Sequence, residues 1–321
     1  AQSAIDAVVD GRVKIIPSRY AKTYIDWLAE KRDWPVSRQL WWGHRIPIWS
    51  KLCTTKEQHD AEQKVLQSDP EVKSGAVAVQ VEMDEERAAA EAKGNLVQGA
   101  ENVDLPYCTI HLCFDEENKA LAKKWEDRGY VREEDVLDTW FSSALWPHST
   151  LGWPEQTPEL KYFYPTSLLI TSRDIITLWV ARMVLTGLNN CGDVPFRQVF
   201  IHPKVLDGYG DTMSKSKGNG VDPIDVIEKF GADALRYGMA NLATETQDVR
   251  MPVQFECPNC QTLIDQTRKN RILPVVPCTS CGKSFSTMWA ETPEEKAHPR
   301  GAVVSERFEA ARNFCNKLWN A

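Results

Sequence analysis

The sequence predicts an α/β protein that contains a parallel sheet and, separate from it, a cysteine-bearing module. Residues 167–171 form a short apolar run, residues 175–188 an apolar helical stretch, and residues 197–201 a second apolar run. This strand, helix, strand order is typical of a parallel sheet, because the helix returns the chain to the edge from which the first strand started. Two Cys-x-x-Cys pairs within residues 257–281 indicate the module.

Length, charge and the distribution of apolar residues limit the class of protein. The chain has 321 residues, 42% of them hydrophobic, which is enough for two or three modules. A net charge of -7 without a long basic run excludes a large nonspecific nucleic-acid surface. The first ten residues lack a secretion-signal pattern, and the longest apolar stretch, 175–185, is too short to span a bilayer. We therefore expect a soluble, cytoplasmic protein with no membrane partner.

The segment 34–49 is rich in aromatic residues. Pro35, Gly43 and Pro47 exclude one long helix there, so strand and loop are expected. Residues 50–117 are polar and acidic, and we interpret them as an insertion.

Within that acidic region, residues 76–82 alternate in polarity, and residues 84–94 have the acidic start and final glycine of a helix. Further helices are expected from Asp233 to near Ala243 and over residues 305–319. The last one places four apolar or weakly polar side chains on one face, namely Phe308, Ala311, Cys315 and Leu318.

The loop at residues 207–220 concentrates glycines, hydroxyl groups and two lysines between a strand and a helix. Glycines let backbone N–H groups approach a polyphosphate, and Lys215 can stabilise its charge. The glycine and lysine spacing is not that of a Walker loop. From these residues alone, an ordinary solvated basic loop is an equally good interpretation.

The string Thr-Met-Ser-Lys-Ser-Lys-Gly-Asn at residues 212–219 resembles the Lys-Met-Ser-Lys-Ser signature of class I aminoacyl-tRNA synthetases. Thr212 replaces the first lysine, and the second is kept as Lys215. Four further strings are similar to the valyl-tRNA synthetase family: VSRQLWWGHRIP at 36–47, DVLDTWFSSALW at 135–146, STLGWPE at 149–155 and ARNFCNKLWN at 311–320. The resemblance covers most of the chain except the acidic insertion and the cysteine module.

The cysteine module carries two knuckles, Cys257-Pro-Asn-Cys260 and Cys278-Thr-Ser-Cys281. Four thiolates at this spacing predict a tetrahedral zinc site, and a closed four-cysteine shell predicts a structural role. The module has few large apolar residues, so the metal is expected to supply its order. A weaker hypothesis is a second, irregular site made from four other residues: Cys53, Cys108, His111 and Cys113.

The resemblance implies the second half of a Rossmann-like catalytic domain, with an inserted zinc ribbon and the start of a helical domain. The implied segments are the amino-acid pocket at 1–49, the insertion at 50–117, the ATP-binding half at 118–250, the zinc ribbon at 251–292 and the start of the stem or anticodon-binding domain at 293–321. The family's other ATP motif, His-x-Gly-His, is absent, because no histidine is followed three residues later by another. We therefore expect an internal fragment without the N-terminal half of the catalytic domain and without the editing domain, inactive when isolated.

The resemblance also implies site residues. Met213, Ser214, Lys215 and Ser216 would bind ATP, with Lys215 stabilising the leaving pyrophosphate. Asp174 and His202 are expected at the carboxyl ends of parallel strands, where such sheets bind ligands, and the resemblance implies that they contact adenosine. Considered alone, Asp174 is also a candidate helix N-cap, and His202 an ordinary strand-end histidine.

Trp42 and Trp140 match tryptophans of the family's amino-acid pocket, and Val136 is a third wall by the same resemblance. Aromatic walls make a rigid apolar box for a small branched side chain. The chain has 12 tryptophans, so most must belong to the core instead.

The implied reaction joins valine to ATP, taken with Mg²⁺ as the substrate, and then transfers the valyl group to tRNA(Val). An isoleucyl or leucyl synthetase is the alternative within the enzyme class. A noncatalytic zinc-ribbon module that binds RNA or a protein is the alternative outside it.

Overall fold

The computed structural model describes residues 1–30, 33–83, 107–243 and 247–321. The expected helix at 84–94 lies outside these residues. The chain forms two compact units, Ala1–Lys31 with Pro147–Ala321, and Arg32–Trp146. Among the described residues, no helix combines the length and apolarity required to cross a bilayer.

The first unit contains the predicted parallel sheet, with strand order β1-β9-β8. β8 (Thr166–Ser172) leads through a π-helical segment, Ile176–Val180, into α9 (Ala181–Cys191), and the chain returns as β9 (Phe196–His202). The β-α-β prediction is therefore confirmed. β1 (Lys14–Ile16) adds a third strand that pairs parallel to β9.

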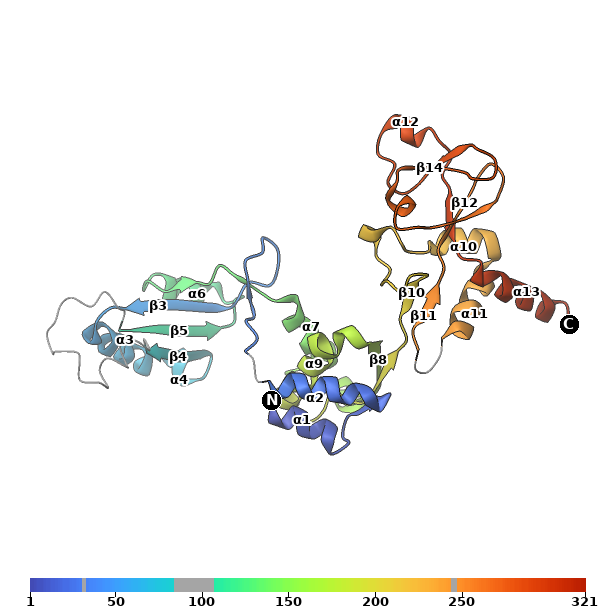
Figure 1. Ribbon diagram of the computed structural model, residues 1–321. Helices are drawn as coiled ribbons and strands as arrows, with labels where there is room; N and C mark the ends of the chain where they lie inside the picture. The colour runs from blue at the N-terminus through green and yellow to red at the C-terminus, as the bar shows by residue number, and fades with distance from the viewer. Residues whose placement is uncertain (31–32, 84–106, 244–246) are drawn as a thin grey trace. The chain divides into compact units, whose positions relative to one another are not determined.

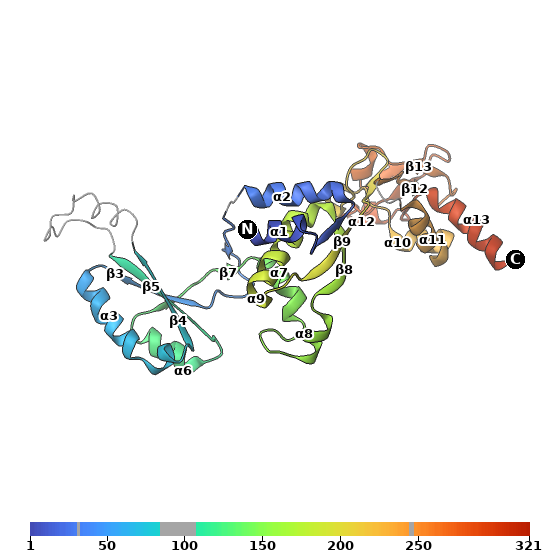
Figure 2. The ribbon, with the colours of Figure 1, turned by 90° about the horizontal axis from the view of Figure 1, so that it is seen from below.

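Two N-terminal helices that the sequence analysis did not predict, α1 (Gln2–Val9) and α2 (Ala21–Ala29), lie side by side in both views (Figures 1 and 2). The buried Tyr24 hydroxyl donates to the Ala4 carbonyl oxygen at 3.0 Å and joins the two helices. They share one core with the sheet and α9. Its largest buried members are Tyr24, Ile176, Met183 and Phe196. The short α8 (Pro158–Phe163) precedes β8.

A second part of this unit is built on the parallel pair β10 (Val205–Asp207) and β11 (Val249–Met251). It contains α10 (Pro223–Phe230), α11 (Ala232–Leu242) and α13 (Arg307–Trp319), so both C-terminal helices are confirmed. On α13, Phe308 and Ala311 are buried, whereas Leu318 is 67% exposed. The predicted apolar face therefore packs only in its first half.

The cysteine module has two small sheets and one short helix. Its elements are β12 (Gln254–Glu256), β13 (Leu263–Asp265), β14 (Val275–Pro277), β15 (Ser284–Ser286), α12 (Pro293–Lys296) and β16 (Ala302–Val304). Phe255 and Phe285 meet edge to face in its core, with ring centroids 5.8 Å apart. Met213, from the loop at residues 207–220, and Val221, which directly follows that loop, pack against the same core. The module's core is therefore shared with that loop.

The second unit, Arg32–Trp146, holds an antiparallel sheet of order β4-β5-β3-β6, drawn in Figure 1 with its helices α3, α4 and α6. The sheet strands are β3 (Ile48–Cys53), β4 (Val77–Met83), β5 (Cys108–Phe114) and β6 (Val131–Arg132), and the helices are α3 (Lys56–Ser68), α4 (Pro70–Lys73) and α6 (Lys119–Glu126). β4 coincides with the alternating segment. Trp49 stacks on Phe114 at 4.0 Å between ring centroids, within the core of this unit. A separate pair, β2 (Ser37–Arg38) with β7 (Val136–Leu137), precedes α7 (Thr139–Ser149), and β2 lies in the aromatic segment predicted as strand and loop.

Candidate functional site

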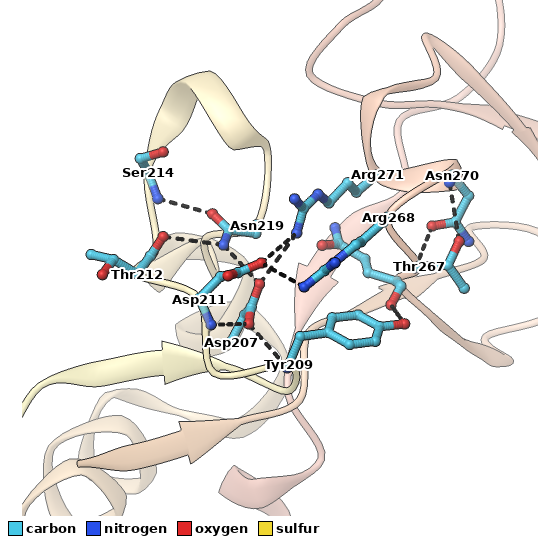
Figure 3. A network of polar contacts seen from close by, with 11 residues as sticks. Asp207, Tyr209, Asp211, Thr212, Ser214, Asn219, Thr267, Arg268, Asn270 and Arg271 are labelled. Atoms are coloured by element: carbon cyan, nitrogen blue, oxygen red, sulfur yellow. Dashed lines mark hydrogen bonds and ion pairs between the residues drawn. The ribbon is translucent and has the colours of Figure 1, made fainter.

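The glycine-rich loop at residues 207–220, called the signature loop below, follows β10 and is held at its base by Asn219. The buried Asn219 accepts the backbone N–H of Ser214 at 2.9 Å, and it donates to the Thr212 carbonyl oxygen at 3.2 Å and to the Asp207 carboxylate at 2.8 Å (Figure 3). One amide thus connects the entry, the middle and the exit of the loop. A glycine-rich segment keeps a defined path because its turns are tied together in this way.

Lys215 and Lys217 lie in a single 3₁₀ turn, Lys215–Lys217, and both side chains are exposed. A cavity of about 580 Å³ is lined by Met213, Ser214 and Lys215 of the loop and by Met288 and Arg300 of the cysteine module's part of the chain. This volume is in the range of small-molecule sites. Ser216 does not line it. The structure therefore brings three of the four predicted Met-Ser-Lys-Ser residues to one cavity.

Asp174 and His202 lie where the parallel sheet predicts, at the carboxyl ends of the adjacent strands β8 and β9. Ser172 and His202 are partners in the strand register, and Asp174 follows in the first turn after β8. The His202 ring donates from Nδ1 to the Pro203 carbonyl oxygen at 2.8 Å, which fixes the orientation of the ring. Both side chains are exposed, so a ligand at this edge can reach them.

Lys204, which the sequence analysis missed, forms an ion pair with the Asp174 carboxylate. The N-cap of that turn is Ser172, and no side chain caps it. The N-cap alternative for Asp174 is therefore not what the structure has. The backbone N–H of Lys204 donates to Asp248 at 3.0 Å, and Arg173 donates to the same carboxylate at 2.8 Å, which holds this edge of the sheet in place.

The three residues predicted for the amino-acid pocket differ in burial. Trp42 is 87% exposed, Trp140 is half-buried at the start of α7, and Val136 is 5% exposed on β7. Gly43, next to Trp42, packs directly on Val136, because a Cβ built at Gly43 would lie 2.8 Å from a Val136 methyl. Trp42 and Val136 are thus on neighbouring segments. Among the described residues of this unit, these side chains do not form a closed apolar box, since Trp42 has almost no cover.

Gly43 gives a test of this packing. Gly43→Ala is expected to destabilise the Arg32–Trp146 unit by about 1 to 3 kcal/mol, the usual cost of forcing a methyl group into a filled position. Val136 is short, branched and buried, so it cannot move aside at low cost. Thermal melting should show a lower midpoint for this variant. Gly220→Ala, whose Cβ would meet nothing within 4 Å, is the matched control, and equal midpoints for the two variants would contradict the prediction.

The four predicted metal ligands, Cys257, Cys260, Cys278 and Cys281, converge. Their Sγ atoms all lie within 4.8 Å of one another. The Cys257 and Cys281 sulfurs are 3.8 Å apart, and those of Cys260 and Cys278 are 3.6 Å apart. A tetrahedral ion with metal–sulfur bonds of about 2.3 Å requires sulfur separations of about 3.8 Å. These two separations match that requirement, so the four cysteines could hold a tetrahedral metal ion.

Hydrogen bonds around these sulfurs support the same conclusion. The backbone N–H groups of Ser280 and Cys281 point at Cys278 Sγ at 3.4 and 3.5 Å, as in a turn that wraps a metal-bound thiolate. Against a backbone hydrogen bond from Lys283, burial and the neighbouring sulfurs raise the pKa of Cys281 to about 11, whereas the Thr262 hydroxyl and backbone N–H lower the pKa of Cys260 to about 6. A thiol that ionises easily is a ready metal ligand.

The second metal hypothesis fails in the structure. Cys53 and Cys108 are register partners and both are buried, whereas His111 and Cys113 alternate with Cys108 and lie on the other face of β5. His111 instead contacts the Ser50 hydroxyl at 2.8 Å. Within the described ranges, the four-cysteine group is the one cluster able to hold a metal.

A family model described as tRNA synthetases class I (I, L, M and V) matches residues 1–252 of this chain. The chain belongs to this family. A protein of Rhodopirellula baltica named valine–tRNA ligase is 62% identical over the whole chain, which spans 30% of that relative's length. One of the same name from Carboxydothermus hydrogenoformans is 38% identical over the whole chain, which spans 24% of its length. Methionyl-tRNA synthetase from Mycobacterium tuberculosis, solved with methionyl-adenylate, is 17% identical with a TM-score of 0.42 over 78% of this chain and 33% of that one.

The family match confirms the predicted fold class, and it disfavours the alternative of a ribbon module without catalytic-domain residues. The match ends at residue 252, before the first knuckle at Cys257. The cysteine module therefore lies beyond the part of the chain that the family model describes.

Several residues of the module touch the signature loop and were not predicted as site residues, among them Arg271 and Trp289. Arg271 pairs with Asp207, and the Trp289 indole lies against Gly218. The basic run at residues 268–271, between the two knuckles, was the one available signal. It gave no indication of which acidic partner it would meet.

Proposed function

We propose that this chain is part of a valine–tRNA ligase and supplies the half of its ATP site that contains the signature loop. The observation that carries the proposal is the 62% identity, over all 321 residues, to the Rhodopirellula baltica protein named valine–tRNA ligase. The geometry supports it, since Met213, Ser214 and Lys215 share a cavity.

In the proposed reaction a valine carboxylate oxygen attacks the α-phosphorus of ATP. The bond from that phosphorus to pyrophosphate breaks, and valyl-adenylate forms. The valyl group then passes to the terminal ribose of tRNA(Val), and AMP is released. Such catalysis depends mainly on positioning and on stabilising developing charge. Mg²⁺ would arrive with ATP and neutralise phosphate charge.

Each site residue has a proposed part. Lys215 stabilises the charge that builds on the leaving pyrophosphate, while Met213, Ser214 and Ser216 shape the loop around the phosphates. Asp174 and His202 hold the adenosine from the carboxyl ends of β8 and β9. For Asp174 this requires the ligand to share the carboxylate with Lys204. Trp42, Trp140 and Val136 are the proposed walls of the valine pocket, and because Trp42 is 87% exposed, valine or a further part of the enzyme would have to cover it.

The four-cysteine group is proposed to hold one structural zinc ion. Four sulfur ligands at tetrahedral spacing suit zinc, and they leave no open position for a catalytic water. The proposed division of the chain is the amino-acid pocket at 1–49, the insertion at 50–117, the ATP-binding half at 118–250, the zinc ribbon at 251–292 and the start of a helical domain at 293–321. The last segment also supplies β16, which pairs with β12 of the ribbon. The proposed site of action is the cytoplasm.

Valine-dependent exchange of pyrophosphate into ATP tests the proposal. The full-length enzyme that contains this chain is expected to catalyse the exchange with valine in preference to isoleucine or leucine. The 321-residue chain alone is expected to be inactive, because it has no His-x-Gly-His motif. Preference for isoleucine or leucine would favour another member of the family. Robust exchange by the isolated chain would show that the ATP site needs no further motif.

A further inference from the structure

The cysteine module contacts the signature loop through a network of polar side chains (Figure 3). Asp207, which starts the loop, has a side chain only 3% exposed. Its carboxylate accepts from the backbone N–H groups of Tyr209 at 3.0 Å and Asp211 at 2.8 Å, and from Asn219 at 2.8 Å. Arg271 of the module reaches the same carboxylate at 3.3 Å with a side chain 13% exposed.

This pairing has an electrostatic consequence. Burial alone would raise the pKa of Asp207, but hydrogen bonds from Asn219 and the backbone, together with the Arg271 charge, lower it below the ordinary value. Asp207 is therefore a buried anion, and Arg271 is the cation beside it. A buried charge that loses its partner is strongly unfavourable. Separating the loop base from the module would leave Asp207 as a buried charge without its cation, so this contact is costly to break.

A second contact lies at the other end of the loop. Gly218 has a left-handed backbone with φ of +64°, and a Cβ built there would lie 2.7 Å from Trp289 Nε1 and 2.8 Å from the Arg271 carbonyl oxygen. The Trp289 indole donates to that same oxygen at 2.9 Å. Arg271 and Trp289 therefore form one surface against which the turn after Lys217 is packed. The loop is held on both sides of Lys215.

We propose that the cysteine module positions the signature loop through Arg271 and Trp289, so that metal binding at the four cysteines is coupled to the ATP step. The coupling to the ATP step rests on the proposed function, whereas the contact between the module and the loop does not. Arg271 and Trp289 are positioning residues, since they act through Asp207 and Gly218. Ordering a glycine-rich loop costs much conformational entropy. A fixed surface beside the loop orders it before ATP binds, so less of that entropy is lost during the ATP step.

Replacing Arg271 in the full-length, metal-loaded enzyme tests the proposal. Arg271→Ala is expected to lower kcat for valine-dependent pyrophosphate exchange by about tenfold or more, as misplacement of a reacting group by a fraction of an ångström can do, with little change in KM for valine. Arg271→Lys should restore part of the rate, because it keeps a cation beside Asp207. Lys269→Ala is the matched control, since Lys269 lies two residues from Arg271, carries the same charge and is exposed, and its rate should stay close to wild type.

A double-mutant cycle decides whether the effect passes through the pair. Asp207→Asn removes the charge from the loop side and leaves the module intact. If both substitutions act by breaking the same ion pair, the double variant Asp207→Asn with Arg271→Ala should lose much less kcat than the product of the two single losses. Multiplicative effects, or a wild-type kcat for Arg271→Ala with metal retained, would overturn the proposal.

Hydrogen exchange of the unliganded enzyme gives a readout that does not depend on activity. Amides in residues 207–220 should exchange faster in Arg271→Ala than in Lys269→Ala, and faster after the metal is removed. Unchanged exchange in this loop would overturn the positioning role even if the enzyme is a valine–tRNA ligase. Conversely, a wild-type enzyme without valine-dependent activity would refute the proposed function and leave the loop measurement valid.

Discussion

Lys215→Ala in the full-length enzyme is expected to lower the rate of valyl-adenylate formation by about a hundredfold or more, the usual cost of removing one well-placed group that stabilises transition-state charge. The lysine lies in an exposed turn of a glycine-rich loop and lines the cavity beside Met213 and Ser214. It can therefore close onto the phosphates as charge builds on the leaving pyrophosphate. An interaction made mainly in the transition state lowers kcat and kcat/KM together when it is removed. Single-turnover formation of the adenylate measures the effect.

Lys217→Ala is the matched control for that substitution. Lys217 lies in the same 3₁₀ turn, carries the same charge and is also exposed, but it does not line the cavity. Its replacement should change adenylate formation by no more than about severalfold, because water and salt screen the interaction of an exposed Lys217 charge with phosphates bound in the cavity. Equal small losses in the two variants would indicate a general basic loop and would remove the main catalytic assignment.

Removing the metal is expected to unfold the cysteine module. Structural zinc sites contribute an apparent binding free energy of about 10 to 16 kcal/mol, which the module loses when the metal is removed. Two of the four ligands, Cys257 and Cys278, belong to the module's small apolar core, so the metal and the packing depend on the same residues. We expect one zinc ion per chain, lost together with protection of the module's amides after chelation or in Cys260→Ser.

Cys113→Ser provides the matched control, because Cys113 is exposed and lies outside the metal cluster. It should retain one zinc ion and the wild-type melting profile. Metal analysis of the purified protein and thiol titration without denaturant measure the site directly. Absence of zinc with all four module thiols freely reactive would contradict the prediction. Equal loss of zinc from Cys260→Ser and Cys113→Ser would show that zinc binding does not depend specifically on the four assigned ligands.

Features that depend on a few neighbouring residues could be predicted from the sequence. The β-α-β unit follows from apolar runs of suitable length, and the convergence of the four cysteines follows from two local knuckles. Asp174 and His202 could be placed because adjacent parallel strands end at the same edge. The helices α1 and α2 were not predicted. Their buried faces pack against strands β8 and β9 and helix α9, which lie far along the chain from them, and a local pattern does not show such contacts.

The antiparallel sheet of the second unit was also beyond local patterns. β3 pairs with β5, and Cys53 is the register partner of Cys108, so the contact joins residues that are distant in sequence. Alternation along β5 places His111 and Cys113 on the face opposite Cys108, and this ruled out the second metal site. The alternation of a strand decides which face each side chain occupies, but only the pairing shows that such a strand exists.

The sequence by itself determined the family resemblance, the signature loop around Lys215 and the four metal ligands, because each is encoded in a short run of residues with a fixed chemical requirement. Only the tertiary structure decided that Arg271 lies beside the buried Asp207 and that Trp289 closes on Gly218. Arg271 is 64 residues from Asp207 along the chain. The physical reason is that charge pairing and close packing depend on distance in space, which a linear pattern does not specify once the chain between two residues is long.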